Sequence, residues 1–197
     1  MLNGTIVMIR HGEKSGDALT ERGMEQMRLA VTKACPSIYH GITRILHSPV
    51  GRTTQGAQVI AQALGVEDVQ PLIGAGVEWL PPEGMEELIA VVKLMRGRAV
   101  TPQSHPKQTI GDWQKMMGGL GEQLRSRFYA ELLQAIADLP DGSRVVVVSH
   151  EQLVDGWAPK DGQVAGEAET FAYILKMGTL TASGRYQWSD DEANTWG

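Results

Sequence analysis

The residues of this sequence best suited to chemistry are Arg10 and His11, which directly follow the apolar run 5–9. A guanidinium keeps its charge at every physiological pH and offers paired hydrogen-bond donors to oxyanions. A neutral imidazole is an effective nucleophile near neutral pH. Side by side behind a strand, the two groups could bind a phosphate and attack it, although one such turn occurs by chance in many proteins.

Two later segments repeat this arrangement of an apolar run followed by a polar turn. The run 43–47 leads into a turn that carries Arg52, and the run 144–148 leads into His150. If the three runs are parallel strands of one sheet, their carboxyl ends lie on one edge, where open α/β sheets bind their ligands. The residues predicted to gather on that edge are Arg10, His11, Arg52 and His150.

These three blocks resemble the signature of the histidine phosphatase superfamily, also called the phosphoglycerate mutase-like family. That signature has an R-H-G-E turn, a later S-P-x-x-R-x-x-Q-T segment and a late S-H turn. The sequence matches it in the same order at residues 10–13, 48–55 and 149–150. It departs from the family pattern at Gly56, where Thr is common, and at Glu151, where Gly often follows the second histidine.

The resemblance implies a metal-independent phosphatase that hydrolyses a phosphomonoester or a phosphoramidate through a phosphohistidine on His11. For this role one ring nitrogen should donate its proton to a backbone carbonyl, leaving the other free to attack. Arg10 and Arg52 are expected to bind the phosphoryl oxygens, and His150, when protonated, to act as a further catalytic and phosphate-binding donor.

The reaction also needs an acid that protonates the leaving oxygen and later activates water, a contribution of about 10²–10⁴-fold. In the family this acid is often a Glu in the loop after the third strand, which points to Glu78. Glu83 and Glu151 are the substitutes. The adjacent Trp79 is expected to shield Glu78 from water.

Three other readings of the same residues stay open. The first is a catalytically weak phosphate-binding interaction module of the same fold, suggested by Glu151 and by the uncertain acid. The second is a phosphoglycerate-type mutase, which is disfavoured because residues 14–20 lack the mutase continuation Ser-x-Trp-Asn. The third, a metal hydrolase using His11, His47, His150 and a carboxylate, is weakened because no His-x-x-x-His ligand pair occurs. No cofactor is expected, and His47 is expected to pack in the core or lie at the surface.

Composition is compatible with a cytoplasmic enzyme of one domain. The 197 residues carry a net charge of −5 without a Lys/Arg-rich run, which argues against nucleic acid as a partner. The sole cysteine, Cys35, has no partner for an internal disulfide, and no leader or membrane-spanning segment is recognised. The expected partner is a phosphorylated small molecule or a phosphoprotein, with no membrane contact, and the oligomeric state is open.

Strand-like and helix-like segments alternate along the chain, which predicts an α/β fold with three layers: a mainly parallel sheet with helices on both faces, phosphoglycerate mutase-like. The whole chain, 1–197, is expected to form one domain. Its irregular segment, about 73–121, is expected to be a lid or wall over the site, or else a peripheral excursion that covers the sheet edge. The expected helices are 24–31, 53–64, 84–95 and 122–139, and the expected strands are 5–9, 44–47, 69–72, 144–149, 170–177 and 180–188.

Overall fold

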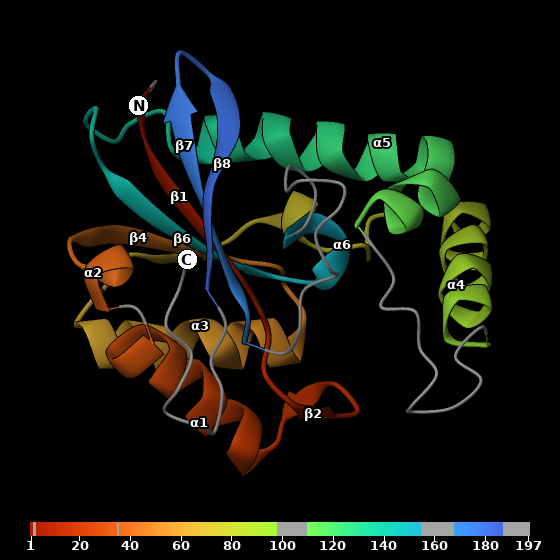
Figure 1. Ribbon diagram of the computed structural model, residues 1–197, viewed down its shortest axis with the longest axis horizontal. Helices are drawn as coiled ribbons and strands as arrows, with labels where there is room; N and C mark the ends of the chain where they lie inside the picture. Colours follow the sequence, from red (N-terminus) through yellow and green to blue (C-terminus); the bar gives the residue numbers. More distant parts are fainter. Residues whose placement is uncertain (2, 35, 98–109, 155–167, 187–197) are drawn as a thin grey trace.

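The centre of the protein is a six-stranded sheet with the order β5-β4-β6-β1-β7-β8. The computed structural model describes residues 1, 3–34, 36–97, 110–154 and 168–186 (Figure 1). Strands β5, β4, β6 and β1 are mutually parallel, and β7 runs antiparallel to β1 and β8. The predicted α/β fold with a mainly parallel sheet is confirmed. The strands are β1 (Asn3–Arg10), β4 (Ile42–His47), β5 (Val69–Pro71), β6 (Arg144–Ser149), β7 (Thr170–Lys176) and β8 (Thr179–Tyr186).

Helices cover both faces of this sheet (Figure 1). One face carries α1, α2 and α3, and the other carries α5 and α6, with α4 packed against α5 at the far end of the molecule. None of the described helices is long and apolar enough to cross a membrane. The helices are α1 (Glu21–Leu29), α2 (Pro36–Tyr39), α3 (Gly51–Leu64), α4 (Pro82–Gly97), α5 (Ile110–Ala135) and α6 (Glu151–Val154).

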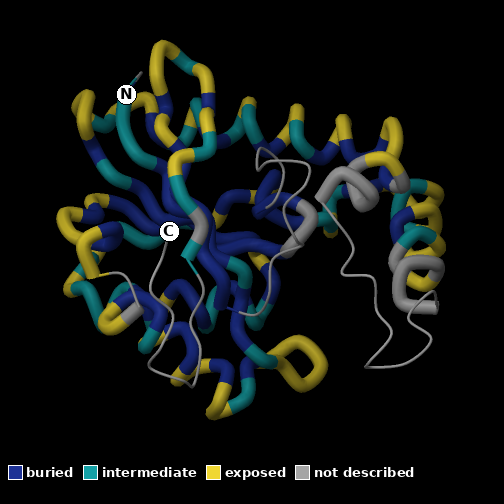
Figure 2. Tube along the Cα trace, in the orientation of Figure 1, coloured by how far each residue is buried: buried dark blue, intermediate teal, exposed yellow. Residues whose placement is uncertain are grey.

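Strand β1 is apolar along its length because both of its faces are buried. Val7 and Ile9 belong to the core between the sheet and α1 and α3, whereas Ile6 and Met8 belong to the core under α5. All four side chains are 0% exposed, and the strands form the dark centre of Figure 2. A buried parallel sheet reads in sequence as a continuous apolar run for this reason.

The first helices begin and end at residues whose local chemistry accounts for their positions, although α1 starts three residues before the expected 24. Thr20 caps α1, since its hydroxyl accepts a hydrogen bond from Gly23 N at 3.0 Å. The helical path continues through a π-turn, η1 (Ala30–Ala34), and Pro36 opens α2 as a first-turn proline. Gly65 ends α3 with a left-handed φ of 68°, a conformation that glycine adopts without strain.

The segment 73–121 is more regular than the sequence suggested. It contains a short 3₁₀ turn, η2 (Ile73–Ala75), then α4, and then the first part of α5. The glycine-rich stretch 116–121 was expected to be irregular, but α5 runs through it with one kink at Gly118 (φ 49°, ψ −132°). Glycine absorbs the break at a single residue because it has no Cβ to clash. The role of the segment 73–121 as a lid stays a prediction, and residues 98–109 lie outside the described part.

Candidate active site

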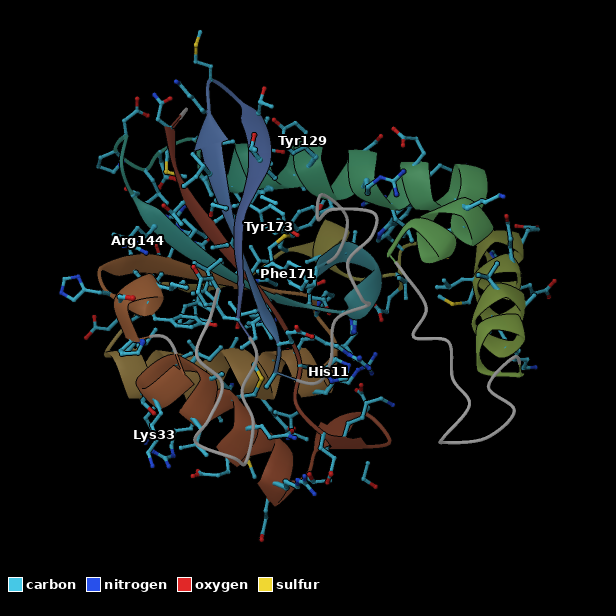
Figure 3. All side chains as sticks on the ribbon, viewed as in Figure 1. His11, Lys33, Tyr129, Arg144, Phe171 and Tyr173 are labelled. Carbon is cyan, nitrogen blue, oxygen red and sulfur yellow. The ribbon has the colours of Figure 1, made fainter. Side chains whose placement is uncertain are left out.

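The carboxyl ends of β1, β4 and β6 bring three of the predicted residues into contact. His11 N donates a hydrogen bond to Ser149 O at 3.1 Å, which ties the turn after β1 to the end of β6. The His11 and His150 ring centroids lie 5.4 Å apart at an angle of 71°. Arg52 donates from Nη2 to Nδ1 of His150 at 3.4 Å. Figure 3 shows His11 where the strands end, beside α3.

The hydrogen bond of His11 defines its tautomer. Nδ1 lies 2.8 Å from Gly12 O, and a carbonyl oxygen can only accept, so Nδ1 carries the proton. Nε2 then keeps its lone pair and can act as a nucleophile. The ring is 5% exposed, so this lone pair is largely protected from bulk water.

Both histidines of the site are neutral in the free protein. Burial, together with the charges of Arg52, Arg10 and Lys14, lowers the pKa of His11 to about 4, although its hydrogen bond to Gly12 opposes the shift. Burial and the same three cations, along with His11, lower the pKa of His150 to about 3. The site therefore combines neutral imidazoles with positive charge from arginine, a setting suited to an oxyanion.

The turn that carries His11 packs tightly against the start of α1. A Cβ built on Gly12 would lie 2.3 Å from Gly23 O, and one built on Gly23 would lie 2.0 Å from Glu13 O. Gln26 of α1 accepts a hydrogen bond from Glu13 N at 2.7 Å. These contacts fix the backbone that supports the His11 ring.

Arg52 is oriented by a carboxylate that sequence reasoning did not single out. Asp17 lies between the short strands β2 (Lys14–Ser15) and β3 (Ala18–Leu19). Its Oδ1 accepts from Arg52 Nη1 at 3.0 Å, and its Oδ2 accepts from Gly51 N at 3.1 Å. Nη2 of Arg52 points to His150, and Nε is buried with no hydrogen-bond partner among the described residues. The Nε–Nη2 edge can thus bind an oxyanion in bidentate fashion.

Two hydroxyls of the second sequence block also reach the site, although sequence reasoning gave them no role. Ser48 Oγ lies 3.1 Å from Nε2 of His150 and 2.9 Å from Thr53 Oγ1. Both Ser48 and Thr53 are 0% exposed. The available signal was Ser48 itself, which opens the block that also contains Arg52.

The loop after β5 places Glu78 differently from expectation. Glu78 is exposed, and its Oε2 accepts a hydrogen bond from Val77 N at 2.9 Å. The prediction that Trp79 shields it is wrong, because the indole is turned toward α5. Its Nε1 donates to Gly76 O at 3.0 Å, and the guanidinium of Arg127 lies 4.5 Å from the ring centroid.

This loop is nonetheless attached to the site. Ser149 Oγ donates to Ala75 O at 2.7 Å, and a Cβ built on Gly76 would lie 3.2 Å from Ser48 Cβ and 2.1 Å from Glu78 Oε2. Of the substitute acids, Glu83 is exposed in the first turn of α4, and the side chain of Glu151 lies outside the described part.

His47 is packed in the protein and is not directed at the other two histidines. It is 7% exposed, and its Nδ1 donates to Ser48 O at 2.8 Å. Within the described ranges, no group of three or more His, Cys, Asp or Glu side chains is arranged to hold a metal ion. His105 and Cys35 lie outside these ranges, and His40 is exposed.

Burial of two neutral histidines should make folding stability sensitive to acid. The unfolded chain protonates them near pH 6.5, whereas the folded state does so only near pH 4 for His11 and pH 3 for His150. Between these limits the unfolded state binds more protons, so we expect stability to fall as the pH drops below 6.5, by roughly 3 kcal/mol per histidine at pH 4.5. Urea unfolding of the wild type and His150→Asn from pH 7.5 to 4.5 measures this, and the variant should lose less. Parallel losses would contradict a buried neutral His150.

Comparison with known proteins agrees with this geometry. Residues 6–157 match the histidine phosphatase superfamily (branch 1). A protein of Serratia proteamaculans named "Probable phosphoglycerate mutase GpmB" is 28% identical over 165 residues, which is 74% of this chain and 68% of that protein. The family match over residues 6–157 includes all three sequence blocks, and so it covers the strand ends described above.

Two solved structures share the fold. A phosphoserine phosphatase from Entamoeba histolytica, in complex with 3-phosphoglyceric acid, has a TM-score of 0.54 at 21% identity, covering 94% of this chain and 98% of that chain. The protein histidine phosphatase SixA, complexed with tungstate, has a TM-score of 0.51 at 16% identity, covering 92% and 95%. Residues 6–157 match the family, and the sheet places the matched residues at the ends of neighbouring strands. This chain belongs to the histidine phosphatase superfamily.

Proposed function

We propose that the protein is a metal-independent phosphatase that hydrolyses a phosphomonoester or a phosphoramidate through a phosphohistidine on His11. One observation carries the proposal: Nδ1 of His11 is held by Gly12 O at 2.8 Å, which leaves Nε2 as a bare nucleophile. The lowered pKa, about 4, keeps that nitrogen unprotonated across the neutral range. The adjacent arginines supply the positive charge that phosphoryl transfer requires.

The first chemical step transfers the phosphoryl group to the enzyme. The Nε2 lone pair of His11 forms a bond to phosphorus while the bond from phosphorus to the leaving oxygen or nitrogen breaks. The leaving atom takes a proton from the acid, which we assign to Glu78. Arg10 and Arg52 bind the non-bridging oxygens, where negative charge is concentrated in the transition state.

The second step returns the enzyme to its starting state. A water molecule attacks the phosphorus of phosphohistidine, the bond to Nε2 breaks, and the electron pair returns to the ring. The water proton passes to the carboxylate of Glu78, which restores the acid. No metal or cofactor enters this balance, because the positive charge comes from Arg10 and Arg52.

The names of similar proteins support the proposed substrate class. SixA is a protein histidine phosphatase and the Entamoeba protein a phosphoserine phosphatase, so their names suggest a phosphoprotein or a phosphorylated small molecule for this chain. The Serratia protein is named for mutase activity. Residues 14–20 lack the continuation of the first motif found in mutases, and we therefore favour hydrolysis.

Hydrolysis of p-nitrophenyl phosphate in the presence of chelator, from pH 5 to 8, tests this function directly. We expect turnover across the range, together with no conversion of 3-phosphoglycerate to 2-phosphoglycerate. Efficient interconversion would instead identify a mutase. Absence of both reactions in a protein that still binds tungstate would favour the phosphate-binding module. The exposed position of Glu78 is the observation that favours this alternative.

The role of Glu78 predicts a dependence on the leaving group. We expect Glu78→Gln to lower kcat about 10²-fold on an alkyl phosphate, whose leaving oxygen needs a proton, and much less on p-nitrophenyl phosphate, whose leaving group is stable as an anion. Glu87→Gln, an exposed carboxylate in α4 that is not a candidate acid, is the matched control. An unchanged alkyl phosphate rate in Glu78→Gln would move the acid role to Glu83 or Glu151.

A further inference from the structure

We propose that Ser48 and Thr53 are positioning residues for His150: their hydroxyls hold the proton on Nε2, so that His150 receives its second proton on Nδ1 when an oxyanion binds. This inference rests on the proposed function, since it concerns the same phosphate site. The relevant groups form a short chain that runs from the imidazole to two backbone carbonyls.

The two backbone carbonyls at the end of this series of hydrogen bonds determine the direction of each bond. Thr53 Oγ1 lies 2.8 Å from both Ser48 O and Val50 O, and because carbonyls only accept, the single Thr53 hydroxyl proton is committed to them. Ser48 Oγ, 2.9 Å from Thr53 Oγ1, must therefore donate to it. Ser48 then offers only lone pairs to Nε2 of His150 at 3.1 Å, so Nε2 carries the proton.

The hydrogen bond on the opposite side of the His150 ring independently indicates the same tautomer. Arg52 Nη2 lies 3.4 Å from Nδ1 of His150, and a guanidinium can only donate. Nδ1 is thus the acceptor in the free protein, and its lone pair faces the cationic side of the site. Ser48 and Thr53 are 0% exposed and His150 is 6% exposed, so bulk water does not compete with these hydrogen bonds.

This tautomer has a consequence for ligand binding. A lone pair on Nδ1 repels a phosphoryl oxygen, whereas a proton there attracts it, so a bound dianion favours the imidazolium. In the free protein burial opposes that charge most strongly, and the charges of Arg52, His11, Arg10 and Lys14 add to this. The Ser48 hydroxyl accepts from Nε2 in both protonation states, which supports the imidazolium once the dianion is present.

Nuclear magnetic resonance of the ring nitrogens measures the tautomer in the full chain without any ligand. We expect free wild-type protein to show His150 protonated on Nε2 and bare on Nδ1, with the signals assigned by their loss in His150→Asn. A proton on Nδ1 in the free protein would overturn the proposal whether or not the protein is a phosphatase.

Tungstate is the probe for the second half of the proposal, because unlike phosphate it carries no titratable proton between pH 6 and 8. We expect both ring nitrogens to be protonated in the tungstate complex at pH 6, and calorimetry in buffers of different ionisation enthalpy to detect uptake of about one proton. A complex with neutral His150 would contradict the proton uptake. Failure of tungstate to bind would refute the proposed phosphate site, and the tautomer measurement would still decide the role of Ser48.

Variants of the two hydroxyls complete the test. In the tungstate complexes of Ser48→Ala and Thr53→Val we expect His150 to titrate about one pH unit lower than in the wild type, and kcat/KM to fall on the order of tenfold. Thr53→Ser keeps the hydroxyl and should restore wild-type titration. Thr54→Val removes the neighbouring hydroxyl, which lies 3.3 Å from His47 Nδ1, and should leave His150 unchanged. An unaltered titration in both Ser48→Ala and Thr53→Val would refute the positioning role.

Discussion

Replacement of His11 with alanine is expected to lower phosphatase turnover by at least about 10⁴-fold, because in the proposed mechanism it removes the atom that accepts the phosphoryl group. The remaining cations still bind the anion, so tungstate affinity should change far less than kcat. We therefore expect the loss to arise in the chemical step and not in binding. Aryl phosphate hydrolysis in chelator gives the rate, and trapping of acid-labile phosphate on the protein during turnover gives the intermediate.

His40→Ala is the matched control for this experiment, since His40 is an exposed histidine outside the site. It should retain wild-type turnover and wild-type trapping of phosphate. Phosphate that is still trapped on His11→Ala would place the nucleophile on another residue. Hydrolysis by His11→Ala that appears only when chelator is omitted would indicate a contaminating metal enzyme and not this site.

Conversion of Arg52 to lysine should lower kcat/KM on the order of 10²-fold while preserving the charge. An ammonium group cannot present the Nε–Nη2 edge, so one of two parallel donors to the phosphoryl oxygens is lost. It also cannot bridge Asp17 and His150, which Arg52 holds at 3.0 and 3.4 Å. We expect the effect to appear in both kcat and KM, because the proposed role of the guanidinium is to bind both the ground state and the transition state.

The corresponding control is Arg28→Lys, in which a surface arginine paired with Glu25 is changed in the same way. Its turnover and its urea midpoint should equal those of the wild type. Near wild-type kcat/KM in Arg52→Lys would mean that charge alone suffices and that the bidentate geometry is not used. Unfolding measurements on Arg52→Lys separate a binding effect from a loss of structure.

The sequence predicted most of the fold because the relevant signals are local. Thr20 marks the start of a helix through its side-chain hydroxyl, Gly65 marks the end of another through its left-handed backbone, and the apolar run of β1 reflects burial on both faces. The first part of α5 was missed because glycines at 118, 119 and 121 argue for a loop, whereas packing of Met117 and Leu120 in the core keeps the segment helical. Tertiary contacts here override local propensity.

The candidate site was predicted to a lesser extent. The gathering of His11, Arg52 and His150 followed from strand order, since parallel strands end on one edge of a sheet. Contacts that depend on side-chain direction did not follow: Asp17 reaches Arg52 across 35 residues, and Trp79 turns toward Arg127 and away from Glu78. Such directions are set by packing in three dimensions, which spacing along the chain does not encode.

The backbone contact between Gly12 and Gly23 restricts how this protein can vary. Even one methyl group on Gly12 would meet Gly23 O at 2.3 Å, and one on Gly23 would meet Glu13 O at 2.0 Å, so neither position can drift without the turn moving away from α1. A substitution at one glycine is not repaired by a change at the other, because each already lacks a side chain. Both positions are therefore restricted to glycine as long as the turn after β1 packs against α1, although α1 itself contributes no residue to the reaction.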